Sequence, residues 1–355
     1  MTATAPPHAF SPAEEQAMAR ALELAQTPGV PVGPNPRVGC VLLDPSGGIL
    51  AEGYHRGAGT AHAEIAALEE AGDRARGATA VVTLEPCNHT GRTGPCAKAL
   101  VEAGIARVVF AQSDPNPAAA GGATTLRAAG VAVAPGLAAE AARRLNPVWT
   151  FAVEHGRPFV TWKFATTLDG RSAAADGTSR WVSSAAARRD THRLRGECDA
   201  ILVGTGTVLV DDPQLTVRDD QDRPLPRQRQ PLRAVMGLRE IPTDRRILDD
   251  AAETVVLKTR DPGEALAQLF ARDRHHLFLE GGPTLAAAFL AAGLVDEVVC
   301  YVAPMLLGAG RNAVADLGIG TIADACHLDV LEATTVGAGP ETNVRLTMAV
   351  RETGS

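Results

Sequence analysis

The sequence predicts an α/β protein built from two different domains in tandem. At 355 residues the chain is longer than one average domain, and two domains with separate cores are the better expectation. Strand and helix patterns alternate along both halves, which is typical of sheets covered by helices. The motifs of the first half do not recur in the second. We therefore expect two unrelated domains and not a duplication.

The first half opens with a helix and continues as an alternation of strands and helices. Ser11-Pro12-Ala13-Glu14 is a capping box with proline at the first helical position. Aliphatic runs bounded by turn residues indicate strands, and alanine-rich segments indicate helices. The expected elements are strands at 37–43 and 48–54, a helix from His62, a strand at 79–85, a helix at 95–103, a strand at 107–112, a helix at 124–129, a strand at 131–135 and a helix at 138–146.

The pattern restarts after residues 147–158, where Pro147, Gly156 and Pro158 bracket a short segment. We place the domain boundary there and expect domains at 1–150 and 151–355. The expected elements of the second half are strands at 159–165, 199–204, 231–237, 254–258, 276–282 and 296–304 and helices at 184–197, 263–273 and 284–293. The tail from Asp316 onward is less informative.

Composition narrows the class of partner. The formal net charge is −7, so no global positive field draws the chain to nucleic acid or anionic lipid. The N-terminus lacks a basic segment followed by an apolar one, and no apolar run approaches the ~18 residues of a membrane span. We expect small-molecule partners, no nucleic acid, no membrane and a cytoplasmic location. The sequence leaves open the oligomeric state, including a homo-oligomer.

Four residues in the first half have the chemistry of a catalytic metal site. His62 and Glu64 stand at the start of an expected helix, and Cys87 and Cys96 flank the start of the next one. One imidazole and two thiolates can bind zinc and leave its fourth tetrahedral position for water. Zinc lowers the pKa of that water toward ~7, and a nearby unbound carboxylate can shuttle the proton. Glu64 is placed for that role.

Each part of this set has a simpler explanation when taken alone. His62 with Glu64 is most often a solvated helix start, because so short a motif recurs by chance. Two cysteines at this spacing are equally compatible with small buried apolar residues. The order H-x-E, P-C and C, with each part at a strand-to-helix junction, favours the zinc site.

The combined motif resembles a known family. "HAE" followed by "EPC" and a later cysteine is similar to the cytidine deaminase-type zinc deaminases, whose signature is H-x-E and then P-C-x-x-C. Here eight residues, not two, separate Cys87 from Cys96. This insertion, with "GPNPRVGCV" and "SDPNP", resembles the deaminase half of the bifunctional riboflavin-biosynthesis deaminase/reductases. The resemblance implies a three-layer α/β/α domain, and the amide of Asn35, between two prolines, is expected to hydrogen-bond a heterocycle. His89, Arg92 and Lys98 surround the second ligand. They either belong to a polar loop and a helix flank or contact a sugar phosphate.

Three motifs of the second half resemble the reductase half of the same family. They are "KFATTLDGR" at 163–171, "TVLVDDPQLTVR" at 207–218 and "LEGGPTLAAAFL" at 279–290. The last predicts a glycine turn before a helix N-terminus, which favours an anion, although a tight turn alone also needs glycine. The resemblance implies a fold similar to dihydrofolate reductase with NADPH as hydride donor.

The resemblance also implies roles for individual residues of the second half. NADPH is expected against Ala165, Trp181, Thr207, Asp211, Gly282, Pro283, Thr284, Leu285, Ala286, Ala287 and Ala288. Substrate is expected against Lys163, Ser179, Arg195, Leu215, Arg218 and Glu280, with the arginines suited to a 5-phosphate. The alternatives are a solvated helix face for the arginines and a core position for Trp181. Met305 replaces a lysine of the family pattern, so one positive contact is missing, and Gly237 stands where an acidic residue is common; the sequence leaves open the effect of both departures on cofactor affinity.

We therefore predict a two-step enzyme of riboflavin synthesis. The first domain should hydrolyse the 2-amino group of 2,5-diamino-6-(ribosylamino)-4(3H)-pyrimidinone 5-phosphate, and the second should use NADPH to reduce the ribosyl chain to ribityl. A nucleic-acid or nucleotide base deaminase with an accessory domain is the first alternative, although it would be expected to carry a basic strand-binding surface. A non-catalytic zinc-stabilised binding protein is the second, and it would not need Glu64.

Overall fold

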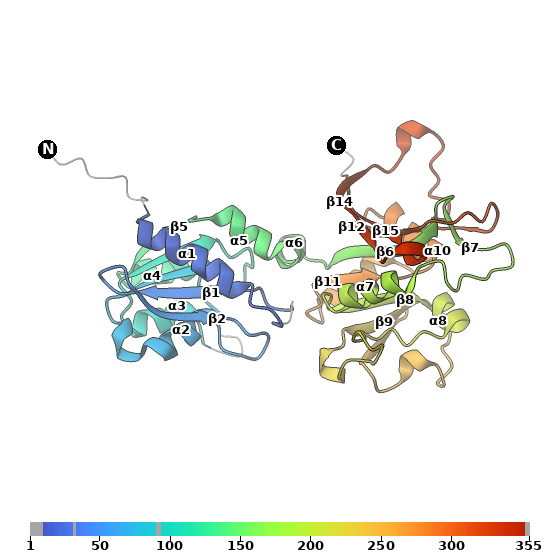
Figure 1. Ribbon diagram of the computed structural model, residues 1–355. Coiled ribbons are helices and arrows are strands. Elements are labelled where there is room, and N and C mark those ends of the chain that lie inside the picture. Colours follow the sequence, from blue (N-terminus) through green and yellow to red (C-terminus); the bar gives the residue numbers. More distant parts are fainter. Residues whose placement is uncertain (1–9, 31–32, 90–93, 352–355) are drawn as a thin grey trace. The chain divides into compact units, whose positions relative to one another are not determined.

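The structure is a computed structural model that describes residues 10–30, 33–89 and 94–351. The chain divides after His155 into two compact units, residues 1–155 and 156–355 (Figure 1). Among the described residues, no helix has the length and apolar character needed to cross a membrane.

The first unit is built on a five-stranded sheet with the order β2-β1-β3-β4-β5. β1 is antiparallel to both of its neighbours, whereas β3, β4 and β5 are parallel. The strands are β1 Gly39–Leu43, β2 Ile49–Tyr54, β3 Thr79–Leu84, β4 Arg107–Gln112 and β5 Ala132–Pro135. The helices are α1 Pro12–Ala25, α2 Ala63–Ala71, α3 Cys96–Glu102, α4 Gly122–Ala128, α5 Ala139–Leu145 and α6 Pro147–His155.

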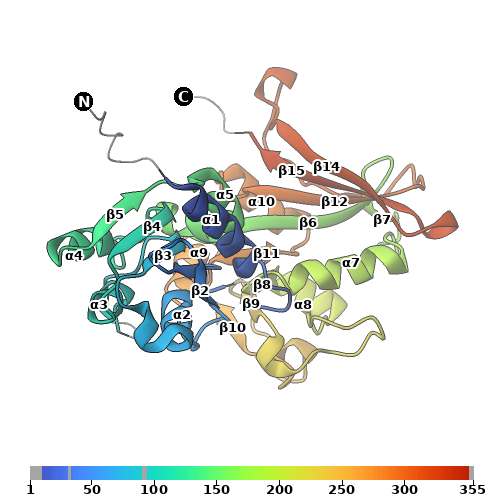
Figure 2. The ribbon, with the colours of Figure 1, turned by 60° about the vertical axis from the view of Figure 1, so that its left-hand side comes forward.

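Helices cover both faces of this sheet, which confirms the predicted three-layer α/β/α architecture (Figures 1 and 2). Successive side chains of a strand point to opposite faces. Val41 accordingly packs with Met18 of α1 on one face, whereas Cys40 and Leu42 pack with Ala67 of α2 on the other. The site described below lies on the second face, because α2 and α3 begin there.

The predicted capping box at the first helix is present. Glu14 N donates to Ser11 Oγ at 3.2 Å, and Ser11 N donates to Glu14 Oε2 at 2.8 Å. The same carboxylate pairs with Arg107 of β4 at 2.5 Å. The cap therefore also ties α1 to the start of β4.

The second unit is built on an eight-stranded sheet with the order β10-β9-β8-β11-β6-β12-β15-β14. The first six strands in this order are parallel, and β15 and β14 complete the sheet as antiparallel strands. The strands are β6 Phe159–Thr167, β8 Ala200–Gly204, β9 Leu232–Met236, β10 Thr254–Leu257, β11 His276–Leu279, β12 Glu297–Ala303, β14 Leu328–Val336 and β15 Asn343–Val350, and β7 Arg171–Ala173 pairs with β13 Arg311–Asn312. The helices are α7 Ala185–Arg195, α8 Thr205–Asp211, α9 Pro262–Phe270 and α10 Pro283–Ala291.

The order of these strands defines a place for a ligand. After β8 the chain runs through α8 to β9 on one side, whereas after the neighbouring β11 it runs through α10 to β12 on the other. In open α/β sheets, ligands bind outside the carboxyl ends of the strands where the connections diverge in this way. The ends of β8 and β11 are therefore the expected binding crevice.

Several elements differ from the sequence predictions. Residues 147–155, predicted only as a bracketed boundary segment, form the helix α6, because Pro147 is tolerated in the first turn. The short helix α8 and the hairpin of β14 and β15 were not predicted. β14 is exposed along most of its length and so lacks the apolar alternation of a half-buried strand. The strand predicted at 276–282 ends at Leu279.

Candidate active sites

The structure brings the three predicted metal ligands of the first unit together. His62 is the N-cap of α2, Cys96 is the first residue of α3, and Cys87 follows β3. His62 Nδ1 lies 3.2 Å from Cys96 Sγ and 3.6 Å from Cys87 Sγ. All three potential ligand atoms lie within 4.8 Å of one another.

The spacing and chemistry of these atoms fit zinc. Zinc–nitrogen and zinc–sulfur bonds of about 2.1 and 2.3 Å at a tetrahedral angle place the two ligand atoms about 3.6 Å apart. Cys96 N donates to Cys87 Sγ at 3.4 Å, and such a contact stabilises a thiolate. Hydrogen bonding from Cys96 is the largest cause that lowers the pKa of Cys87 below its usual value, and His62 lowers it further. Among the described residues, the group contains only these three members, which leaves a tetrahedral ion one open position.

Glu64 lies beside this group without being part of it. It occupies the first turn of α2 and is 4% exposed, and it interacts electrostatically with His62 and Cys87. Burial raises the pKa of Glu64 to about 7. A buried carboxyl next to an open metal position is placed to exchange protons with a metal-bound solvent molecule or a substrate.

Asn35 reaches the same site through His55. Asn35 Nδ2 lies 3.1 Å from His55 Nε2, and His55 Nδ1 lies 3.0 Å from the carbonyl of Ala61. The rings of His55 and His62 meet edge to face, with 5.5 Å between their centroids. The predicted heterocycle contact therefore lies one side chain away from the metal ligands.

The basic residues near the second cysteine are less closely tied to the site. Lys98 is exposed and pairs with Glu102 at 3.6 Å, which fits a helix flank. His89 is also exposed. Arg92 lies outside the described residues.

In the second unit, three predicted substrate residues form one charged cluster. Arg195, at the end of α7, donates from Nε and Nη2 to the two carboxylate oxygens of Glu280, at 2.5 and 2.9 Å. Both side chains are mostly buried, at 13% and 11% exposure. Lys163 of β6 interacts electrostatically with both of them, and its Nζ lies 5.5 Å from the ring centroid of Tyr301.

Burial and charge act in opposite directions on these groups. Burial alone would raise the pKa of Glu280, but Arg195 and Lys163 hold it below its usual value. Burial lowers the pKa of Lys163. The cluster therefore keeps a carboxylate ionised inside the protein beside an ammonium group that gives up its proton more readily than usual.

Two residues that the sequence analysis did not single out belong to the same cluster. Burial lowers the pKa of His192 to about 4, and its Nδ1 lies 3.0 Å from the carbonyl of Thr216. Tyr301 is fully buried below Lys163. His192 was recognisable in principle, because it stands three residues before Arg195 and so lies on the same face of the helix.

The segment that follows α8 carries the remaining substrate candidates. Leu215 is buried and has a φ of 52°, and Arg218 is partly buried. Arg218 Nη2 donates to Gln214 Oε1 at 2.8 Å, while Arg195 Nη1 donates to the Thr216 carbonyl at 3.0 Å. The two predicted phosphate-binding arginines are thus held by the same short segment.

The predicted cofactor turn lies at the crevice between β8 and β11. Gly282 is the N-cap of α10, and no side chain caps the helix there. Gly281 allows close packing, because a Cβ at that position would lie 2.5 Å from the side chain of Leu285. The same leucine lies 3.8 Å from the corresponding position at Gly204, at the end of β8. Pro283 has no N–H and Leu285 N donates to the Gly282 carbonyl at 3.0 Å, so the backbone N–H of Thr284 is the donor of this first turn that can meet a phosphate.

The other cofactor candidates lie on elements around this crevice. Thr207 is in the first turn of α8 and Asp211 is its last residue. Ala165 is on β6, opposite Tyr301 of β12. Of the helix positions, Pro283, Thr284, Leu285, Ala286, Ala287 and Ala288 all lie in the first two turns of α10, and Ala286 is buried.

Trp181 is a surface residue, so a core position for it was wrong. Its side chain is 63% exposed, and the guanidinium of Arg188 lies 4.3 Å from its ring centroid. Arg180 Nη2 donates to the Asp211 carbonyl at 3.0 Å. This contact brings the exposed segment with Ser179 and Trp181 to the end of α8.

The two departures from the family pattern differ in their surroundings. Gly237 has a φ of 142°, and a Cβ there would lie 2.8 Å from Thr205 Oγ1 at the start of α8. Glycine fits this position with less strain than an acidic residue would. Met305 is 40% exposed, and nothing in the structure explains its replacement of a lysine.

The folds and sites define a zinc-dependent deaminase joined to a nucleotide-dependent α/β domain, and comparisons with known proteins identify both parts. Residues 11–112 match the family model of the cytidine and deoxycytidylate deaminase zinc-binding region, and residues 158–340 match that of the RibD C-terminal domain. The riboflavin biosynthesis protein RibD of Mycobacterium tuberculosis is 50% identical over 313 residues, which cover 88% of this chain and 91% of that protein. The RibD of Escherichia coli is 42% identical over 356 residues, with coverage of 91% and 97%.

Solved structures give the same result for the whole chain. Acinetobacter baumannii RibD matches with a TM-score of 0.85 and 35% identity, covering 96% of this chain and 99% of that chain. A Thermotoga maritima diaminohydroxyphosphoribosylaminopyrimidine deaminase/5-amino-6-(5-phosphoribosylamino)uracil reductase matches with a TM-score of 0.78 and 31% identity, with the same coverage. The chain belongs to the RibD family of bifunctional riboflavin-biosynthesis deaminase/reductases. Its first unit is a zinc-binding deaminase and its second an NADPH-dependent reductase, which confirms the predicted enzyme, its cofactors and its small-molecule substrates.

Proposed function

We propose that His62, Cys87 and Cys96 hold the zinc ion and that Glu64 is the acid/base of the deamination. The observation that carries this assignment is the triangle of three ligand atoms within 4.8 Å, with a buried carboxyl beside it and outside the set. Zinc, when bound, supplies a Lewis acid that makes water nucleophilic at neutral pH. The substrate is 2,5-diamino-6-(ribosylamino)-4(3H)-pyrimidinone 5-phosphate, which loses its 2-amino group as ammonia.

Glu64 and Asn35 divide the remaining work of this site. Glu64 takes the proton of the attacking water and delivers it to the departing amino group. Asn35 is oriented by its contact with His55 and presents the rest of its amide to a polar edge of the pyrimidine. The reaction needs one water molecule, at the metal. The low exposure of Glu64 supports a site in which this carboxyl is separated from bulk solvent.

We propose that NADPH binds across the carboxyl ends of β8 and β11. The uncapped N-terminus of α10, from Gly282 to Ala288, receives a phosphate of the cofactor, because the helix dipole and the backbone N–H of Thr284 favour an anion. Ala165, Trp181, Thr207 and Asp211 contact the remainder of the cofactor.

The substrate of the reductase lies against the charged cluster and the segment after α8. Glu280 and Lys163 contact the ribose hydroxyls and the carbon chain that is reduced, with Lys163 placed to exchange a proton. Arg195 contacts substrate and keeps Glu280 ionised through its paired hydrogen bonds. Ser179, Leu215 and Arg218 complete the site, and Arg218 binds the 5-phosphate.

We further propose that the two reactions are chemically independent, with domains close to 1–150 and 151–355. The proposed deaminase residues all precede Ala97, and the proposed reductase residues all follow Arg157. We also infer that the protein is cytoplasmic and acts on free nucleotides and not on nucleic acid, because its net charge of −7 does not favour a polyanion.

Glu64→Gln in the full chain tests the deaminase assignment. The variant keeps the shape of the side chain but cannot accept a proton, so zinc content should be unchanged and ammonia release should fall by about 10²-fold or more. NADPH oxidation on the deaminated intermediate should stay at the wild-type rate. Glu69→Gln, an exposed glutamate on the same helix, is the matched control and should change neither activity.

The zinc content of Glu64→Gln, measured together with its ammonia release, shows which part of the assignment fails if the expected result is not obtained. Loss of zinc from Glu64→Gln would make Glu64 a ligand and not an acid/base. Unchanged ammonia release with full zinc content would show that Glu64 is not the acid/base of the deamination.

A further inference from the structure

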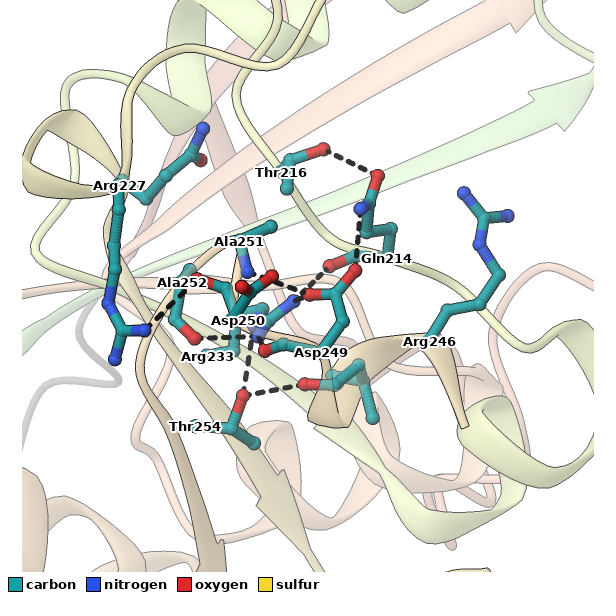
Figure 3. A network of polar contacts seen from close by, with 12 residues as sticks. Gln214, Thr216, Arg227, Arg233, Arg246, Asp249, Asp250, Ala251, Ala252 and Thr254 are labelled. Carbon is teal, nitrogen blue, oxygen red and sulfur yellow. Dashed lines mark hydrogen bonds and ion pairs between the residues drawn. The ribbon is translucent and has the colours of Figure 1, made fainter. Parts of the chain in front are cut away.

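A fully buried arginine stands behind the substrate segment of the reductase unit. Arg233 of β9 is 0% exposed, and all of its guanidinium nitrogens are hydrogen-bonded (Figure 3). Its Nε donates to Thr254 Oγ1 at 2.9 Å. Nη1 and Nη2 donate to side-chain and backbone oxygens of Gln214, Asp249 and Ala252, at 2.6–3.1 Å. A buried charge is tolerated when it is paired and hydrogen-bonded in this way.

Asp249 links this arginine to the substrate segment. Its Oδ1 accepts from Arg233 Nη1 at 2.8 Å, and its Oδ2 accepts from Gln214 Nε2 at 2.7 Å (Figure 3). Burial alone would raise the pKa of Asp249, but hydrogen bonds from Arg233 and Gln214 hold it below its usual value. The carboxylate therefore stays ionised and fixes the amide of Gln214 with its nitrogen inward.

Gln214 is held at both its side chain and its backbone. Arg233 Nη1 donates to the Gln214 carbonyl at 3.1 Å, while Asp249 accepts from the side-chain amide. This arrangement leaves Oε1 pointing away from Asp249, and Oε1 accepts from Arg218 Nη2 at 2.8 Å and from Thr216 Oγ1 at 3.4 Å. A chain of contacts thus runs from buried Arg233 through Asp249 and Gln214 to Arg218.

We propose that Gln214 is a positioning residue of the reductase, which orients Arg218 toward the 5-phosphate of the substrate and is itself fixed by the Asp249–Arg233 ion pair. The inference rests on the proposed role of Arg218 in phosphate binding. It explains why an amide suits this position. The exposed carboxylate of Asp222 already lies 3.6 Å from Arg218 Nη1. A carboxamide oxygen at position 214 accepts a hydrogen bond from Nη2 without adding a second negative charge that would compete with the phosphate.

Two other side chains at position 214 would each fail for a different reason. A leucine would remove the acceptor of Arg218 Nη2, so that, among the described residues, the Arg218 guanidinium keeps only the contacts of its Nη1 with Asp222, and it would remove the donor to Asp249 Oδ2. A glutamate would form an ion pair with Arg218 that competes with the phosphate, and it would face the like charge of Asp249. Both changes should weaken phosphate recognition, although only the second alters the charge.

The test compares two substrates in the full-length protein. The deaminated intermediate with its 5-phosphate and the same compound without it are assayed by NADPH oxidation, and the ratio of their kcat/KM values measures phosphate recognition. Gln214→Leu and Gln214→Glu should each lower this ratio by about tenfold to hundredfold, the range for one hydrogen bond to a charged group. The change should appear in KM for the phosphorylated substrate, with KM for NADPH unchanged. The double variant with Arg218→Ala and Gln214→Leu should show the same ratio as Arg218→Ala alone, because Gln214 acts only through Arg218.

Thr254→Val is the matched control within the same network. It removes the partner of Arg233 Nε without touching Gln214, so it should leave the phosphate ratio at the wild-type value even if it lowers stability. Ammonia release by the other unit checks that each variant is a folded chain. If Thr254→Val and Gln214→Leu lowered the ratio of kcat/KM values equally, the effect would come from a general destabilisation of the network around Arg233, and the inference would be overturned.

The outcome for Arg218→Ala separates the inference from the function on which it rests. If Arg218→Ala lowers kcat/KM equally for both substrates, Arg218 does not bind the phosphate and the proposed function fails at that residue. If Arg218→Ala abolishes the preference while both Gln214 variants retain it, the role of Arg218 stands and the positioning role of Gln214 is overturned.

Discussion

Replacement of Arg233 by methionine should destabilise the reductase unit selectively. Methionine is similar in length and apolar, so it fills the buried space without leaving a large cavity. It removes the partner of Asp249 and the donors to the carbonyls of Gln214 and Ala252. The cost therefore arises from acceptors left without donors and not from lost packing.

The expected size of the effect follows from the exposure of the groups left behind. Breaking a buried ion pair by removing one partner costs about 3–5 kcal/mol. The Asp249 side chain is 34% exposed and can regain water, so the lower end of that range, about 3 kcal/mol, applies. In a unit of roughly 200 residues, such a loss lowers the unfolding temperature by about 6–12 °C.

The change in unfolding temperature can be measured by heating the full chain to a series of temperatures and then assaying the NADPH oxidation and the ammonia release that remain. The reductase should be lost at the lower temperature and the deaminase at the wild-type temperature. Arg227→Met is the control, because Arg227 is exposed and its guanidinium donates to the Asp250 carbonyl at 3.1 Å (Figure 3). A shift of less than about 2 °C for Arg233→Met would show that the buried network does not contribute as calculated.

Three further outcomes follow from the sites. Cys96→Ser should lose zinc and ammonia release together, because a thiolate is replaced by a poor ligand; metal analysis showing full zinc with normal turnover would reject Cys96 as a ligand. Removal of zinc from the wild-type protein by a chelator should stop ammonia release and spare NADPH-dependent reduction of the deaminated intermediate, and loss of both would contradict independence. Burial lowers the pKa of His276 to about 4, below its usual 6.5, so the unfolded chain binds more protons between these values. The free energy of unfolding should therefore fall as the pH drops from 6.5 to 4, by at most about 1.4 kcal/mol per pH unit from this group. When this free energy is measured by urea unfolding at several pH values, it should depend less steeply on pH in His276→Gln than in the wild type.

The candidate metal site could be predicted from sequence because its chemistry is local. His62 and Glu64 lie together at the start of one helix, Cys96 is the first residue of the next helix, and Cys87 follows the strand before it, so the strand-to-helix junctions brought them together. The parallel strands of the reductase unit were predictable for a similar reason, since fully buried strands such as β9 are continuous apolar runs apart from Arg233.

Contacts between distant segments could not be predicted in this way. Arg195 and Glu280 were expected as separate substrate contacts, whereas they form an ion pair across 85 positions of sequence. The exposed strand β14 was missed because its pattern depends on pairing with β15 and not on burial of one face. Helix α6 was missed because the proline and glycine that bracket it suggested a boundary segment.

Arg233 shows how a residue that breaks a local rule can reveal a functional arrangement. An arginine inside an apolar strand carries no signal of its partners, because its acceptors come from Gln214, Thr254 and the segment 249–252. Its burial is tolerable only when those partners are already in place, so the network has to form with the fold and not with the substrate. Gln214 is consequently fixed before the substrate arrives, and the orientation of Arg218 costs little ordering at the moment of binding. This preorganisation is the reason to expect the Gln214 variants to raise KM for the phosphorylated substrate and to leave the rate of hydride transfer at saturation nearly unchanged.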